Sequence, residues 1–179
     1  MDTLKFVKIA DVKSPCRAHP TDAGIDFFVP WFKPGVKTNI MFYPDLSGGY
    51  VRLKSDVLEN EVEKIIVNPG GSVLIPLGVK VLVPKGYAMI FFNKSGVAAK
   101  KSLVVGSCVI DSGYQGELIL NLHNISQEWK EILPGDKIVQ GILLPVNYAN
   151  VEEIGSVEEL YGGIVSDRGE GGFGSSGVK

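Results

Sequence analysis

Hydrophobic residues recur along this chain in short runs that are separated by glycine, proline and asparagine. The runs are rich in β-branched and aromatic residues, and they cover residues 4–9, 25–29, 72–77, 79–83, 87–92, 117–123 and 138–146. Runs of this length that are bounded by turn residues are typical of β-strands. We therefore expect an all-β domain.

Residues 117–123 show the clearest alternation of apolar and polar positions. The alternation places Leu118, Leu120 and Leu122 on one face and Glu117, Asn121 and His123 on the other. Helical signal is confined to two short segments. Residues 95–101 are expected to form one or two turns with Ser95 as the cap, and residues 156–159 have the spacing of a capping box. Evenly spaced strands with so little helix favour a sandwich or a barrel, such as a jelly roll.

Residues 31–68 have a different character from the rest of the chain. This stretch combines a turn-rich segment at 43–49, a charged segment at 54–64 and several aromatic residues that need a partner surface. The charged segment is interpreted either as a β-hairpin arm or as a short helix. The whole stretch is either a lid or an oligomer contact, or a structural elaboration without a role in chemistry.

The composition excludes several classes of protein. Apolar residues make up 45% of the 179 positions, which indicates a packed globular chain, and a net charge of −2 gives no basic excess for a nucleic-acid backbone. Two cysteines and two histidines are too few for a disulfide framework or a structural zinc site. There is no apolar signal core and no apolar run of about 20 residues, so we expect a cytoplasmic protein without membrane contact.

The chain after residue 161 contains few apolar residues and ends in a glycine-rich run at 168–177. Glycine-rich segments of this kind are mobile unless other groups hold them. We therefore expect residues 1–161 to form one domain and residues 162–179 to form a flexible arm.

The glycine-rich run is either a disordered tail or a strap that closes over the phosphates of a nucleotide. Residues 169–174 match the G-x-G-x-x-G pattern, but the strand and helix that a dinucleotide site requires do not flank them. Arg168 has the forked geometry that binds phosphate, and Phe173 can stack on a base. The hydroxyls of Ser175 and Ser176, with neighbouring backbone N–H groups, can bind anions.

Residues 109–118 consist of a strand, a turn with two glycines and a second strand. This pattern predicts a β-hairpin that carries Asp111 and Tyr114 at its tip. Asp111 is either a turn residue that satisfies its own backbone or a general base. Tyr114 would provide a flat surface under a sugar.

Two further segments carry candidate chemistry. Lys94, Ser95 and Gly96 stand at the start of the expected helical turn, and they form either an anion site or an ordinary helix cap. Gln140 lies inside an otherwise apolar strand. Its amide needs partners there, which are either structural groups or a ligand.

Five segments, in their order along the chain, resemble the motifs of the trimeric dUTPase family. They are residues 23–26, 94–98, 109–116, 135–140 and 168–177. The resemblance covers nearly the whole chain except about residues 31–68, and its third and fifth segments are the most diagnostic. It implies a distorted jelly-roll β-barrel with an insertion at 31–68. It also implies a homotrimer in which the arm of one subunit reaches over the active site of another.

The resemblance further implies that the chain hydrolyses dUTP to dUMP and pyrophosphate, with Mg²⁺ on the triphosphate. This reaction keeps uracil out of DNA and supplies dUMP for dTMP synthesis. Asp111 would activate the water that attacks the α-phosphorus, and Tyr114 would pack on the deoxyribose and exclude ribonucleotides. Asp26 would contact the Mg²⁺ ion indirectly, through its water shell.

The other residues that the resemblance assigns to substrate binding are Lys94, Ser95, Gly96, Val109, Ile110, Gln140, Arg168, Phe173, Gly174, Ser175 and Ser176. Backbone groups of the hairpin would read the uracil edge. The residues of the second and fourth segments would contact the phosphates near the scissile bond. The arm would hold the distal phosphates and cover the base.

Three positions depart from the pattern of the family. Lys94 stands where an arginine is usual, which gives a point charge instead of a fork. Ile25 replaces an aromatic residue in the first segment. Val105 replaces an asparagine that contacts the base in many members, so uracil recognition would rely on the backbone.

Two alternatives stay open. A dCTP deaminase of the same fold would need an acid/base glutamate, for which Glu117 is the nearest candidate. A regulatory binding protein would use this fold and residues 31–68 to hold a protein partner.

Overall fold

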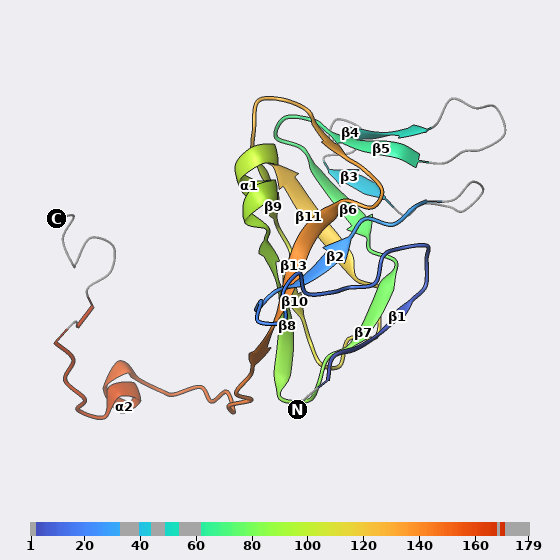
Figure 1. Ribbon diagram of the computed structural model, residues 1–179. Helices are drawn as coiled ribbons and strands as arrows, with labels where there is room; N and C mark the ends of the chain where they lie inside the picture. Colours follow the sequence, from blue (N-terminus) through green and yellow to red (C-terminus); the bar gives the residue numbers. More distant parts are fainter. Residues whose placement is uncertain (1–2, 33–39, 44–48, 54–61, 168, 171–179) are drawn as a thin grey trace. The chain divides into compact units, whose positions relative to one another are not determined.

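The computed structural model describes residues 3–32, 40–43, 49–53, 62–167 and 169–170 (Figure 1). The chain divides into two units, Met1–Asn147 and Tyr148–Lys179. Within the described residues, the first unit contains all the β-strands and the second contains one short helix. The first unit therefore ends before residue 161, where the sequence led us to place the end of the domain.

The first unit consists of short strands and one helix. In chain order the strands are β1 (Lys5–Lys8), β2 (Ile25–Phe28), β3 (Met41–Tyr43), β4 (Gly49–Leu53), β5 (Val62–Val67), β6 (Ser72–Pro76), β7 (Val79–Leu82), β8 (Tyr87–Asn93), β9 (Leu103–Val105), β10 (Val109–Ile110), β11 (Ile119–Asn124), β12 (Lys130–Ile132) and β13 (Lys137–Pro145). Helix α1 (Ser95–Lys101) lies between β8 and β9, and α2 (Val157–Tyr161) belongs to the second unit. Every predicted run contains a strand, so the all-β prediction is confirmed.

The described strands form antiparallel sheets. Their strand orders are β10-β8-β13-β2, β3-β6-β11-β9, β12-β5-β4 and β1-β7. In the first sheet, β13 pairs with β2 on one side and with β8 on the other, and β8 also pairs with β10. This sheet therefore brings together strands that carry or adjoin the first four segments of the family resemblance (Figure 1).

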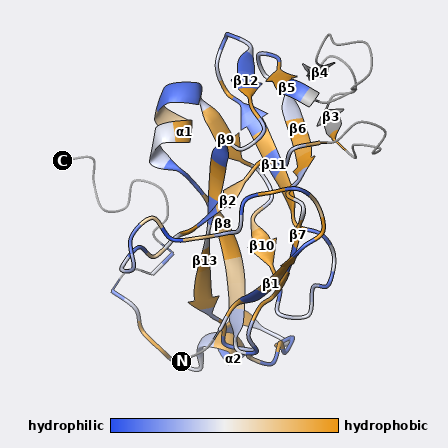
Figure 2. Cartoon of the chain, turned by 45° about the vertical axis from the view of Figure 1, so that its right-hand side comes forward, coloured by the Kyte–Doolittle hydropathy of each residue, from blue (hydrophilic) through white to orange (hydrophobic). Residues whose placement is uncertain are grey.

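The core between the sheets is apolar. Leu118, Leu120 and Leu122 are at most 1% exposed, whereas the polar residues that alternate with them are partly exposed, as the alternation predicted. The colouring of Figure 2 shows that hydrophobic residues concentrate in the strands. Phe27 and Phe91 meet edge to face in this core, with ring centroids 5.4 Å apart. Removal of this apolar surface from water is the main term that stabilises the unit.

Part of the 31–68 stretch is integrated into the sheets. Strand β3 pairs with β6, and β4 and β5 form an antiparallel pair. Strand β5 also pairs with β12, and its Ile65 and Val67 are fully buried. The pairing of β4 with β5 agrees with the hairpin interpretation of the charged segment, although residues 54–61 lie outside the described residues. The end of this stretch contributes to the core of the unit.

The two helices show how local side chains set helix ends. Helix α1 has Lys94 as its N-cap, so the prediction of Ser95 as the cap is wrong. The Lys94 side chain does not cap the helix, because an ammonium group has no acceptor for the backbone N–H groups, and it pairs with Asp26. In α2 the Ser156 hydroxyl accepts the Glu159 N–H at 3.0 Å, which confirms the predicted capping interaction. Within the described residues, no helix has the length and hydropathy that a membrane span requires.

Candidate active site

Strand β10 leads into the tight turn that carries Asp111, but the predicted β-hairpin is wrong, because β10 pairs with β8 whereas the next strand, β11, pairs with β6 and β9 in another sheet. The Tyr114 N–H donates to the Asp111 carbonyl at 3.1 Å and closes this turn. Both side chains are exposed, and both line one cavity of about 240 Å³. The remaining lining residues are mostly apolar, namely Phe91, Ser107, Cys108, Val109, Ile110, Leu118 and Ile119. A carboxylate and a phenol therefore share a largely apolar cavity, as expected for a site that binds a nucleoside.

The Tyr114 ring is held in place by its neighbours. Its hydroxyl donates to the Glu117 carbonyl at 2.8 Å. The ring lies against Gly116, where a Cβ atom would come within 2.3 Å of the tyrosine hydroxyl oxygen. Any larger residue at position 116 would displace the ring, so this glycine is required for close approach.

The Glu117 side chain has a structural partner. Its Oε1 atom accepts the Gly78 N–H at 2.8 Å, and Gly78 has a φ of +67°, which favours glycine. This bond joins the turn between β6 and β7 to the segment between β10 and β11. Glu117 was the nearest candidate for the catalytic group of a deaminase, and its carboxylate is engaged elsewhere.

A charged triad with a buried carboxylate at its centre lies where β2 meets β13. Asp26 is 3% exposed, and its two carboxylate oxygens accept hydrogen bonds from two different ammonium groups. One bond comes from Lys94 and the other, at 2.9 Å, comes from Lys137. Burial alone would raise the pKa of Asp26, but the hydrogen bonds and charges of Lys94 and Lys137 outweigh burial and lower the pKa below its ordinary value of 3.8. The pairing with Asp26 also raises the pKa of Lys137.

The Gln140 amide in β13 is held by a hydrogen bond at its nitrogen and by close packing at its oxygen. Its nitrogen donates to the Asn93 carbonyl at 2.9 Å, and its oxygen lies against Gly24, where a Cβ atom would come within 2.2 Å. The Asn93 side-chain oxygen in turn accepts the Val105 N–H at 2.7 Å. Because that N–H is a donor, the atom of the Asn93 amide that faces it is the oxygen. Asn93 therefore links β13, the strand of Gln140, to β9, the strand of Val105.

The sequence-predicted residues fall into two groups along one sheet. The first group contains Asp26, Lys94 and Gln140, and the second contains Val109, Ile110, Asp111 and Tyr114. Strand β8 connects the groups, since it pairs with β13 through Asn93 and with β10 through Ile90. Ser95 and Gly96 are exposed at the start of α1. The predicted residues of the arm, Arg168, Phe173, Gly174, Ser175 and Ser176, lie outside the described residues.

Lys137 and Asn93 also belong to the first group, although no pattern in the sequence singled them out. Lys137 lies inside the fourth segment of the family resemblance, and Asn93 immediately precedes the second. A single lysine or asparagine beside a motif has no distinguishing pattern. Their roles become visible only through the pairing of β2, β8 and β13, which brings distant segments into contact.

In the part of the chain that the structure describes, no three acidic, cysteine or histidine side chains cluster as ligands for a metal ion. Asp26, which we expected near Mg²⁺ through water, holds a lysine with each oxygen. The indirect contact of Asp26 with Mg²⁺ therefore stays a prediction.

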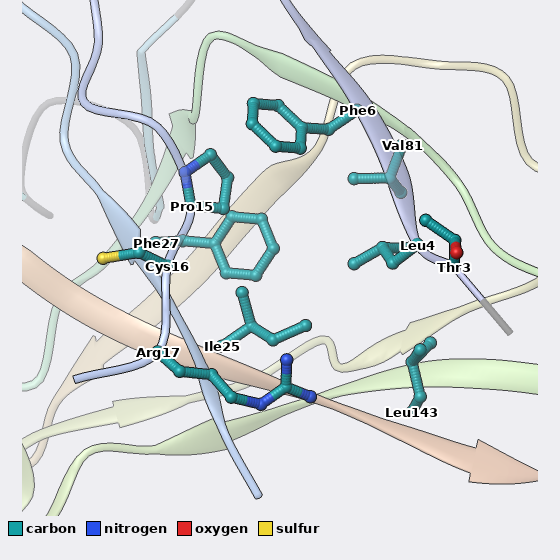
Figure 3. Close-up of a pocket in the computed structure, with 10 residues that line it drawn as sticks. All are labelled: Thr3, Leu4, Phe6, Pro15, Cys16, Arg17, Ile25, Phe27, Val81 and Leu143. Carbon is teal, nitrogen blue, oxygen red and sulfur yellow. The ribbon is translucent and has the colours of Figure 1, made fainter. Parts of the chain in front are cut away.

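A second cavity of about 280 Å³ lies between the N-terminal segment and the sheet (Figure 3). Its lining residues are Thr3, Leu4, Phe6, Pro15, Cys16, Arg17, Ile25, Phe27, Val81 and Leu143. Most of these side chains are apolar, and Arg17 donates from Nε to the Asp22 carbonyl at 2.8 Å. None of the predicted site residues lines this cavity, so it is separate from the cavity of Asp111 and Tyr114.

A sequence model of the dUTPase family matches residues 61–177, which is more than half of the chain. The chain belongs to the dUTPase family. A deoxyuridine 5′-triphosphate nucleotidohydrolase of Corynebacterium jeikeium is 31% identical over 179 residues, which span 98% of this chain and 93% of that relative. A relative of the same name from Neisseria meningitidis is 39% identical over 119 residues, which span 65% of this chain and 75% of its own.

Two solved phage enzymes show the dUTPase fold that this chain shares. The dUTPase of Staphylococcus bacteriophage 80alpha, solved with dUPNHPP, is 25% identical with a TM-score of 0.72, and the match covers 99% of this chain and 100% of that one. The dUTPase of phage phi11 of S. aureus, described for its species-specific insert, is 22% identical with a TM-score of 0.64 and coverage of 88% and 99%. The predicted all-β dUTPase fold class is confirmed.

Proposed function

We propose that this member of the dUTPase family hydrolyses dUTP to dUMP and pyrophosphate, and that it acts in the cytoplasm. The reaction would keep uracil out of DNA and supply dUMP for dTMP synthesis. The structural observation that supports it best is the cavity shared by Asp111 and Tyr114. The 80alpha enzyme, which has the same fold, was solved with dUPNHPP, a dUTP-like ligand.

Asp111 is the proposed general base. Its carboxylate takes a proton from a water molecule while the water oxygen forms a bond to the α-phosphorus. The bond between the α-phosphorus and the oxygen that bridges to the β-phosphate breaks, and pyrophosphate leaves with the electron pair. Asp111 then returns the proton to solvent. Its exposed position at the end of β10 leaves the carboxylate accessible to this water.

Tyr114 and the backbone of β10 would bind the nucleoside. The ring of Tyr114 is held by Gly116 and by the Glu117 carbonyl, so it cannot move aside to make room for the 2′-hydroxyl of a ribose. A ribonucleotide would therefore clash, and a deoxyribose would pack flat on the ring. Val109 and Ile110 would read the uracil edge with backbone groups, which fits the presence of a valine at position 105.

The triphosphate would be held by preorganised donors, which is how enzymes stabilise charge that develops on phosphate oxygens. Near the scissile bond these donors are Lys94, Ser95, Gly96 and Gln140. Donors of the arm, Arg168, Ser175 and Ser176, would hold the distal phosphates. Phe173 and Gly174 of the arm would cover the base.

Mg²⁺ would enter with the triphosphate. A phi11 dUTPase variant was solved for its coordination of a structural Mg(II) ion. Hard oxygen ligands and retained water are what Mg²⁺ prefers, so phosphate oxygens with Asp26 behind a water shell are a suitable donor set. When bound, the ion would neutralise charge on the phosphates, while the chain itself orients the substrate and moves the proton.

The proposed assembly is a homotrimer with shared active sites. In the second unit, Val151, Ile164 and Val165 are 101%, 76% and 92% exposed. These apolar side chains would be covered if the second unit packs on a partner subunit. The trimer, and the protein partner expected for residues 31–68, stay proposals.

Pyrophosphate release with Mg²⁺ from dUTP, dCTP, dTTP and UTP tests the proposal, and release from dUTP alone is expected. Asp111→Asn should fold and bind dUPNHPP, while kcat falls by about 10²–10⁴-fold because the base is lost. Glu152→Gln, which removes an exposed carboxylate that does not line the cavity, is the matched control. Near-normal turnover by Asp111→Asn would reject Asp111 as the base, and ammonia release from dCTP would favour the deaminase.

A further inference from the structure

The Asp26 carboxylate holds two lysines at once, and only one of them, Lys94, is itself proposed to bind phosphate. The side chains of Asp26, Lys94 and Lys137 are 5%, 23% and 40% exposed. The carboxylate is thus the buried centre of the triad. The two ammonium groups approach it from different strand ends, since Lys94 follows β8 and Lys137 begins β13.

A carboxylate this deeply buried is strongly destabilised when it loses every counter-charge. If Lys94 left Asp26 to bind a ligand and Lys137 were absent, a buried charge would remain unpaired. With Lys137 in place, Asp26 keeps one hydrogen-bonded ammonium group at 2.9 Å. The triad therefore contains one cation more than the carboxylate needs.

The surroundings of Lys137 favour this holding role. Its Nζ atom lies 5.9 Å from the centroid of the Phe28 ring, which adds a weak cation–π attraction. Asp136, its neighbour along the chain, is already paired with Lys101 at 2.8 Å. Lys137 is thus directed to Asp26.

We propose that Lys137 is a positioning residue for triphosphate binding, because it holds Asp26 and so allows Lys94 to leave the carboxylate and bind the phosphates of dUTP. This inference rests on the proposed function, in which Lys94 contacts those phosphates. A lysine suits the exchange, because its ammonium is a point charge on a flexible stem that can replace one anion by another. Lys137 acts through Lys94 and does not touch the substrate.

A double-mutant cycle on the KM for dUTP tests the proposal. Lys137→Met removes the ammonium group and keeps most of the stem. It should raise KM about tenfold with little change in kcat, which corresponds to the loss of one charged hydrogen bond to the substrate. Lys137→Arg keeps the cation and should restore most of the affinity. In a Lys94→Met background, Lys137→Met should change KM no further, because it acts only through Lys94.

Two outcomes would overturn the proposal. If Lys137→Met raises KM by the same factor in both backgrounds, Lys137 contacts the triphosphate directly. If KM does not change, or if only the thermal midpoint falls, Lys137 has a purely structural role. Where Lys137→Met does not fold, Lys137→Gln keeps a donor for Asp26 without the charge, and it should raise KM in the same direction.

Two controls make the result specific. Lys130→Met removes a lysine that pairs with the exposed Glu128 at 2.9 Å and should leave KM unchanged. The unmodified chain is assayed first for pyrophosphate release from dUTP. If it releases none, the proposed function fails. If it is active, but Lys137→Met raises KM equally with Lys94 present or replaced, only the inference about Lys137 is refuted.

Discussion

Among single residues, close packing decides which side chains the active site presents. Gly24 lies against Gln140, and Gly116 lies against Tyr114, so tightly that a Cβ atom would come within 2.2 or 2.3 Å of the functional side chain. Packing this close leaves each side chain few alternative positions. Preorganisation of the site therefore begins with residues that have no side chain.

Asp26 gives a prediction for the acid stability of the protein. Its lowered pKa means that the charged triad stabilises the fold fully above the ordinary value of 3.8, and that this stabilisation is lost as pH falls through the lowered pKa. Asp26→Asn should lower the thermal midpoint at pH 7 by roughly 10 °C, because two lysines lose a buried partner. The difference between the unmodified chain and Asp26→Asn should narrow below pH 3.8 in thermal unfolding experiments. If the difference in thermal midpoint between the two proteins does not change with pH, the charged form of Asp26 does not stabilise the fold.

At the scale of the element, β8 organises the active site. It pairs with β13 and β10, it ends at Asn93, and the phosphate-binding segment follows it. Asn93 accepts the Val105 N–H with its side chain and the Gln140 amide with its backbone. A displacement at the end of this strand would therefore reach both the group that is proposed to bind phosphate and strand β9, which contains Val105.

Asn93→Ala is expected to lower kcat for dUTP about tenfold or more, because small displacements of catalytic groups are costly. The loss of one side-chain hydrogen bond costs only about 1 kcal/mol, so the fold should persist. Asn93→Asp keeps the acceptor for Val105 and should recover kcat, and Asn147→Ala is a control at an exposed asparagine. Hydrogen exchange at the Val105 amide should accelerate in Asn93→Ala only. If hydrogen exchange at Val105 and kcat for dUTP are both unchanged in Asn93→Ala, Asn93 does not position the active site.

The sequence predicted the strands well, because alternation and turn residues are local signals. It also predicted that Asp111 and Tyr114 share one turn, since they are neighbours in sequence. The β-hairpin predicted around them is wrong, because the pairing of β10 with β8 and of β11 with β6 and β9 depends on segments that lie far apart in the sequence. It did not predict that β5 packs in the core, because the charged residues before it masked a strand whose partner, β12, lies far along the chain. Lys137 was missed for the same reason, since its partner Asp26 lies in a distant strand.

For the whole molecule, the division into two units is the main constraint on function. The first unit carries Asp111, Tyr114 and the charged triad, whereas the second leads into the glycine-rich segment at 168–177. Under the proposed function, chemistry and substrate closure would belong to separate units. Such a division allows one chain to supply the turn of Asp111 and another to supply the glycine-rich segment at 168–177.

If active sites are shared in this way, two inactive variants should rescue each other. A chain that ends at residue 167 lacks the arm, and Asp111→Asn lacks the base, so each alone should lose at least a hundredfold in turnover. When the two variants are refolded together in equal amounts, about half of the chains carry Asp111 and the other half carry the arm. Random assembly into trimers would then restore about a quarter of the sites. Pyrophosphate release from the mixture, compared with each variant refolded alone, measures this rescue. Trimers without rescue would show that the arm serves its own chain.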